Sequence, residues 1–182
     1  MNRIRVLTGP IVLGALLAST PQPVLGQGDD EESPVEITCR ECIVGNEIAS
    51  PQLLEFLAKN LSVKFMAKKD EGLVWVALRL EIVSQDESIM WKYESEPVEV
   101  ESGQTYAAST WVTQRDRHEA PGFGERRKIT FGSVVVVNHE EQYMPRECEG
   151  ATHAVRITLV SDGRLFWEPN KPINFVCLRV DG

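Results

Sequence analysis

The pair Cys39 and Cys42 is the pattern in this sequence with the best-defined chemistry. Two cysteines separated by two residues exchange disulfides when the first thiolate is stabilised at a helix N-terminus. They also supply half of a zinc site when a second close pair exists. Here the nearest expected helix begins well after Cys42, and Cys148 and Cys177 lie far apart in the sequence. We therefore predict structural disulfides, with the redox and zinc interpretations as alternatives.

Four cysteines allow three pairings, and the sequence alone leaves all three open. We favour Cys39–Cys42 with Cys148–Cys177, because the last two fall in the same C-terminal sheet region. Each disulfide would stabilise the fold by about 2–4 kcal/mol.

A basic loop is expected over residues 114–128, where five lysines and arginines outnumber three acids. Arginine forms paired hydrogen bonds with carboxylates and sulfates, and long loops on a rigid scaffold often carry binding residues. Phe123 lies between two glycines, so we expect it to be exposed as an apolar anchor. The loop is thus a candidate site for an acidic glycan or partner; alternatively, it only connects two strands. Its candidate ligand-binding arginines are Arg115, Arg117, Arg126 and Arg127.

Tryptophans supply the second set of candidate binding residues, since sugars pack against aromatic rings. Most tryptophans in a β-sandwich fill the core or its edges. Trp75 and Trp111 occupy the more polar faces of their expected strands, so we predict that these two contact a ligand.

Catalytic motifs are scarce. His118, His139 and His153 lack metal-ligand spacing, and the chain contains neither a Gly-x-Ser-x-Gly elbow nor a phosphate-binding glycine loop. We therefore predict no metal, no cofactor and no catalytic residue. Two enzyme alternatives stay open: a hydrolase whose fold assembles two carboxylates, and a thiol–disulfide oxidoreductase that uses Cys39 and Cys42.

The N-terminus predicts export. Residues 1–26 begin with Arg3 and Arg5, continue with an apolar run and end in small residues, which is typical of a secretory signal peptide. Residues 27–34 form an acidic linker without apolar side chains, which we expect to be disordered. Residues 35–182 then make a single domain. Loss of the two arginines takes the net charge from −8 to −10, which disfavours nucleic acid and stable membrane association.

The stretch of residues 73–83 best defines the fold class. Its even positions are all apolar, which predicts a strand with one face in the core. Its odd positions change from apolar at Trp75 to charged at Arg79 and Glu81, so we expect this second face to run from the core out to solvent. The even positions are Val74, Val76, Leu78, Leu80 and Ile82.

Alternating patterns of this kind recur along the chain and predict roughly nine antiparallel strands. Ser50 as N-cap and Pro51 in the first turn predict one short helix over residues 51–60. Residues 105–114 are expected to form a strand, residues 161–164 a hairpin turn, and Gly132 a bulge or close approach. The predicted fold is all-β: an antiparallel β-sandwich with one short N-terminal helix, or alternatively a barrel-like closed sheet.

Taken together, the sequence favours a secreted, disulfide-stapled binding module whose ligand is a carbohydrate or a protein surface. A structural component of the cell envelope or matrix is a third class, besides the two kinds of enzyme. The ligand and the oligomeric state are beyond what the sequence specifies.

Overall fold

Strands dominate the described part of the chain, as predicted. The computed structural model describes residues 35–65, 73–118, 121–123, 127–137, 144–161, 164–165 and 173–181, all within one compact unit. The predicted signal peptide (1–26) and linker (27–34) lie outside the described residues. In the ranges described, no helix is long and apolar enough to cross a membrane.

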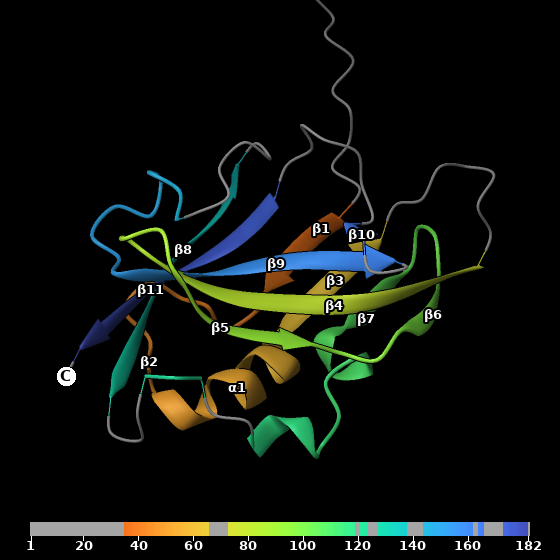
Figure 1. Cartoon of the computed structure of the whole chain (residues 1–182), viewed down its shortest axis with the longest axis horizontal. Helices are drawn as coiled ribbons and strands as arrows, with labels where there is room; N and C mark the ends of the chain where they lie inside the picture. The colour runs from red at the N-terminus through yellow and green to blue at the C-terminus, as the bar shows by residue number, and fades with distance from the viewer. Residues whose placement is uncertain are drawn as a thin grey trace, which may run out of the picture. The chain divides into compact units, whose positions relative to one another are not determined.

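The strands form two antiparallel sheets, shown in Figure 1. The smaller sheet has the order β1–β3–β7, with β1 (Val35–Cys39), β3 (Leu61–Phe65) and β7 (Thr105–Ala107). The larger sheet has the order β2–β8–β11–β9–β4–β5, while β10 pairs with β9 and β6 with β4. Its strands are β2 (Glu47–Ala49), β4 (Leu73–Ser84), β5 (Ile89–Glu94), β6 (Val98–Glu101), β8 (Lys128–Val137), β9 (His153–Ser161), β10 (Arg164–Leu165) and β11 (Ile173–Asp181).

The two sheets share one hydrophobic core, which confirms the predicted antiparallel β-sandwich. Asn174 of β11 joins them directly, because its side-chain Nδ2 donates to the Val35 carbonyl of β1 at 3.2 Å. The larger sheet also curls into half a barrel. The alternative prediction, a barrel-like closed sheet, therefore describes part of its curvature.

The one α-helix among the described residues follows the predicted pattern with a different start. A 3-10 turn, η1 (Ser50–Gln52), precedes α1 (Leu53–Asn60). Ser50 lies within this turn and is not the N-cap, and the Gln52 side chain accepts the Ala49 backbone N–H at 3.3 Å. On the inner side of α1, Leu53, Leu54 and Leu57 are completely buried, while Phe56 stacks on Phe131 of β8 with ring centroids 4.5 Å apart. Burial of this apolar face fixes the helix in place.

The long strand β4 confirms the predicted core face and reverses the predicted second face. Val76, Leu78, Leu80 and Ile82 are all completely buried, whereas Val74, predicted on the same face, is only half-buried. On the second face, the apolar start is exposed, whereas the charged half is covered and Glu81 is only 5% exposed. The expectation that the charged half lies in solvent is therefore wrong.

Both disulfides have the favoured pairing, Cys39–Cys42 and Cys148–Cys177. The second one fastens residues 144–150 to β11. Opposite it, the register between β8 and β11 shifts, and a Cβ on Gly132 would stand 3.0 Å from the Cβ of Cys177. Only glycine fits so close to the disulfide without displacing it, which confirms the predicted bulge and close approach at Gly132.

Candidate functional site

A break in one edge of the larger sheet creates the candidate site. Strands β5 and β6 follow one another along β4: Glu94 of β5 pairs with Arg79, and Val98 of β6 pairs with Val76. The three residues between them, 95–97, include Pro97, which has no N–H to donate to a sheet ladder. The edge strand is therefore interrupted opposite the middle of β4.

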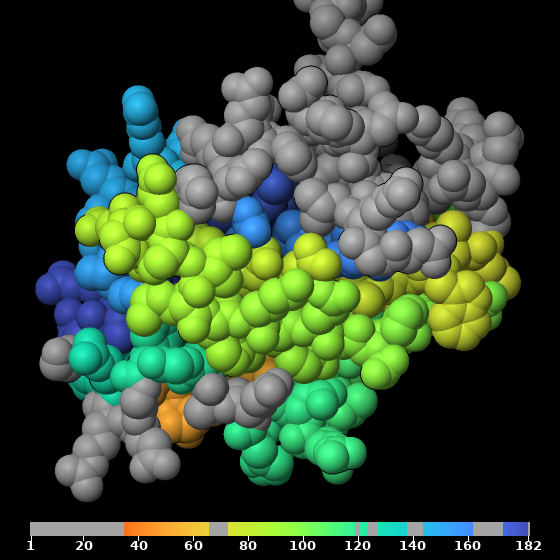
Figure 2. Space-filling view, viewed as in Figure 1, coloured from red at the N-terminus to blue at the C-terminus, as the bar shows by residue number. Residues whose placement is uncertain are grey.

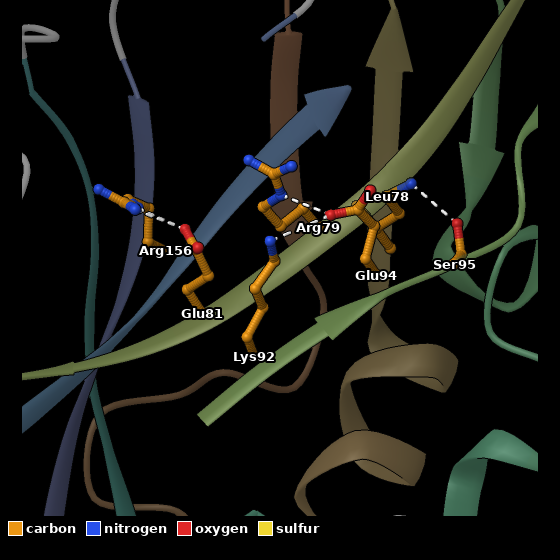
Figure 3. A network of polar contacts seen from close by, with 7 residues as sticks. All are labelled: Leu78, Arg79, Glu81, Lys92, Glu94, Ser95 and Arg156. Atoms are coloured by element: carbon orange, nitrogen blue, oxygen red, sulfur yellow. Dashed lines mark hydrogen bonds and ion pairs between the residues drawn. The ribbon is translucent and has the colours of Figure 1, made fainter. Parts of the chain in front are cut away.

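Ser95 keeps the interrupted edge attached to β4 (Figure 3). Its side-chain Oγ accepts the Leu78 backbone N–H at 2.9 Å, and its own backbone N–H donates to the Leu78 carbonyl at 3.0 Å. The hydroxyl in turn donates to the Glu96 carbonyl at 2.9 Å. The Ser95 hydroxyl thus accepts the Leu78 N–H in place of a backbone carbonyl of the edge strand. The main chain of residues 95–97 can therefore turn away from β4.

A groove of about 390 Å³ lies at this break. Its apolar lining comes from β4, from β9 and from the segment 95–97, and two carboxylates lie beside it. The lining residues are Trp75, Ala77, Glu94, Ser95, Glu96, Pro97 and Val160. The start of β4, yellow in Figure 2, reaches the surface at the right-hand end of the face shown.

Trp75 is the exposed large hydrophobic side chain of this groove, with 59% of its surface exposed. Its backbone is held firmly, because Ser161 Oγ donates to the Trp75 carbonyl at 3.1 Å and Trp75 pairs with Glu99 of β6. Directly opposite residues in antiparallel strands place their side chains on the same face, so the Glu99 carboxylate stands beside the indole. An indole fixed on a strand offers a flat surface on which a ligand can stack.

Glu94 is held as an anion at the edge of the groove. Its Oε2 accepts from Arg79 Nε at 2.8 Å and lies 3.3 Å from Lys92 Nζ, as Figure 3 shows. Burial alone would raise the pKa of Glu94, but the hydrogen bonds and charges of Arg79 and Lys92 outweigh it and lower the pKa. A carboxyl group held ionised does not suit the general acid that a glycosidase requires.

Replacing Ser95 with alanine should lower the free energy of unfolding by about 1–3 kcal/mol, because the buried Leu78 N–H loses its acceptor. Urea unfolding of the two proteins measures the difference. Ser109→Ala, at an exposed position of the 3-10 turn η2 (Ala108–Thr110), is the matched control and should have no measurable effect. Equal stability of the Ser95 and Ser109 variants would show that the interrupted edge does not depend on this hydroxyl.

Trp111 lies in the core and not on the polar face of a strand, contrary to the prediction. The expected strand over residues 105–114 ends at Ala107, and η2 follows. This turn brings Trp111 and Val112 into the core together, at 2% and 0% exposure. The indole Nε1 donates to the Val76 carbonyl at 3.0 Å, so Trp111 packs beneath the strand that carries Trp75.

Phe123 is also buried, at 7% exposure, so the expectation of an exposed anchor is wrong. Its ring meets His153 edge-on with centroids 4.9 Å apart. Gly122 lies beside the backbone of Met90, where a Cβ would stand 3.6 Å from the carbonyl oxygen. The segment therefore lies against β5, where a side chain at position 122 would make only an ordinary contact. Burial lowers the pKa of His153, which keeps its imidazole uncharged at neutral pH, although the charge of Asp86 opposes the shift.

The basic loop is only partly described, and Arg126 lies outside the described residues. Arg115 and Arg127 are exposed and Arg117 is half-buried, and no described contact joins the three. Asp116, in the 3-10 turn η3 (Asp116–His118), has its pKa lowered chiefly by a hydrogen bond from Thr113. The start of this loop is therefore organised by its own polar contacts, and the buried Phe123 does not form an exposed anchor beside Arg115 and Arg127.

The chain matches no family model, no curated protein and no solved structure. The remaining chemical candidates thus depend on geometry alone. Cys39 ends β1 and the chain then turns toward β2, so the helix N-terminus that favours a reactive thiolate is not beside it. Among the described side chains, no three of histidine, cysteine, aspartate and glutamate gather as metal ligands.

The groove combines one predicted residue with several that the sequence analysis missed. Trp75 was predicted, whereas Glu96, Pro97, Ala77 and Val160 were not. The sequence does contain one signal for them: Pro97 falls between two alternating strand patterns, and proline interrupts a ladder.

Proposed function

We propose that this protein is a secreted binding module that holds a carbohydrate chain against Trp75. The observation that carries the proposal is a largely exposed indole, fixed on a strand, at the wall of a groove of about 390 Å³. Sugar rings present C–H groups on one face that pack on an aromatic ring, and their hydroxyls donate to nearby carboxylates. Glu96 lines the groove and Glu99 stands beside the indole, so both kinds of contact are available.

Secretion is part of the proposal. Two disulfides are typical of proteins that fold in an oxidising compartment. The predicted signal peptide of residues 1–26 agrees with this, and carbohydrate polymers are abundant outside cells.

Replacing Trp75 with alanine should weaken carbohydrate binding about tenfold or more, because stacking on an aromatic ring contributes roughly 0.5–1.5 kcal/mol beyond buried area. We would screen the protein on a glycan array and measure each hit by isothermal titration calorimetry. The groove lies on the surface, so Trp75→Ala should fold as stably as the unmodified protein.

One control variant defines the result. Val44→Ala removes apolar surface at a residue that is 72% exposed and lies outside this groove, and it should leave the affinity unchanged. Failure of every glycan to bind, or equal affinity of the Trp75→Ala variant, would refute carbohydrate recognition at this groove.

A further inference from the structure

We propose that the groove at Trp75 selects carbohydrate chains that carry free amino groups, such as glucosamine polymers. This inference rests on the proposed function and adds the charge of the ligand. It follows from the side chains that stand on the same face as the exposed indole.

Acidic side chains alternate with the exposed apolar ones where β4 pairs with β6. Trp75 pairs with Glu99, and Leu73, which is 63% exposed, pairs with Glu101. Each pair shares one face of the sheet, because the residues are directly opposite in antiparallel strands. Glu96 adds a third carboxylate from the break between β5 and β6.

These three carboxylates are available to a ligand. Glu94 is neutralised by Arg79 and Lys92, whereas Glu96, Glu99 and Glu101 form no ion pair with any described residue. All three are exposed, and the protein as a whole carries a net charge of −8. The groove therefore combines an apolar wall with negative charge that no cation in the described part of the chain balances.

An ammonium group satisfies this combination better than a hydroxyl does. A cation near the face of an indole is attracted by the ring, most strongly for tryptophan. The same cation pairs with a carboxylate beside the ring. An amino sugar presents its C–H face and its ammonium group together. A single sugar unit of the ligand therefore contacts Trp75 and Glu99 at once. An anionic glycan would be repelled by the same carboxylates.

The test compares three hexasaccharides with the same β-1,4 backbone: glucosamine hexamer, its fully N-acetylated form and cellohexaose. Calorimetry should show that the glucosamine hexamer binds about tenfold more tightly than the two uncharged chains, since each exposed ion pair contributes about two- to fivefold. Raising the salt concentration from about 0.05 M to about 0.5 M should remove most of that preference and leave the binding of cellohexaose unchanged.

Paired variants locate the charge effect. Glu96→Gln/Glu99→Gln should bring the glucosamine hexamer down to the affinity of cellohexaose, while Trp75→Ala should weaken all three sugars. The matched control is Glu87→Gln/Glu149→Gln, which removes the same charge from two exposed carboxylates without a described ion pair. Glu87 follows the far end of β4 from Trp75, so this control should keep the full preference.

Each outcome has one meaning. Equal binding of all three sugars, with loss in Trp75→Ala, would overturn the selection for amines and leave carbohydrate binding intact. A preference that persists in Glu96→Gln/Glu99→Gln would place the cation elsewhere on this acidic protein and also overturn the inference. Absence of binding by all three sugars and by every glycan on the array would refute the proposed function itself, and the inference with it.

Discussion

Replacing Trp111 with alanine should lower the free energy of unfolding by about 3–5 kcal/mol, which is the usual cost of truncating a buried tryptophan. Trp111 is 2% exposed and meets the ring of Tyr106 edge-on, with ring centroids 5.9 Å apart. Its Nε1 donates to the Val76 carbonyl. The substitution would therefore leave a cavity under β4 and delete a buried hydrogen bond. Urea unfolding followed by circular dichroism measures the loss.

Trp111→Phe separates the two contributions. Phenylalanine keeps most of the ring volume but lacks the N–H, so this variant should lose only about 1–3 kcal/mol. It should also bind glycans as the unmodified protein does, because the indole of Trp111 is not accessible. Trp75→Ala should show the opposite result, with unchanged stability and weakened binding. If Trp111→Ala unfolded at the same urea concentration as the unmodified protein, the described packing of Trp111 would be incorrect.

The parts of the fold that were predicted correctly depend on local patterns. Alternation of apolar side chains identified β4 and its buried face, and the leucines of residues 53–57 identified α1. The pairing of Cys148 with Cys177 also followed from placing both residues in neighbouring C-terminal elements. For the strand and the helix, neighbours along the chain carry enough information, since the period of two or 3.6 residues is a property of the element itself.

Trp111 shows why the site was predicted less well. A strand was expected to continue to residue 114, and this placed Trp111 on a polar face. The turn η2 changes the direction of the chain after Ala107, so two successive side chains, Trp111 and Val112, both point into the core. Ser109 and Thr110 are short polar residues that favour turns over strands, and they are the signal that the alternation concealed.

The groove itself depends on contacts between distant residues. Trp75 becomes the wall of a groove only because residues 95–97 leave the edge of the sheet and because Val160 of β9 approaches from the other side. These segments are brought together by pairing across the sheet, which the sequence does not specify by local pattern. The same limit applies to Glu81, whose burial depends on a partner 75 positions away, Arg156.

Removing the Glu81 carboxylate, as in Glu81→Leu, should lower the free energy of unfolding by about 3–5 kcal/mol, the usual cost of breaking a buried ion pair. Glu81 Oε2 lies 2.5 Å from Arg156 Nη2 and 2.9 Å from its Nε, and Figure 3 shows the pair lying across β4 and β9. The side chains are only 6% and 15% exposed. Without Glu81, a largely buried guanidinium loses a hydrogen-bonded anion.

The double variant Glu81→Leu/Arg156→Met tests whether the loss comes from the broken ion pair. Apolar replacements for both partners of a buried ion pair are often neutral or stabilising. Arg156 makes a further interaction besides that with Glu81, so we expect the double variant to recover part of the stability that Glu81→Leu loses. A double-mutant cycle in urea then gives the coupling between the two side chains. Losses that simply add would contradict a direct ion pair.

Glu94→Gln is the matched control for this cycle, because Glu94 forms the neighbouring ion pair on the same face. Its side chain is 35% exposed, and solvent screens its interaction with Arg79. We expect this variant to lose no more than about 1 kcal/mol. The loss of unfolding free energy should thus be about threefold or more larger for Glu81 than for Glu94, although both carboxylates pair with arginines on the same sheet. The difference arises from burial, which holds Glu81 as part of the fold and leaves Glu94 at the edge of the groove.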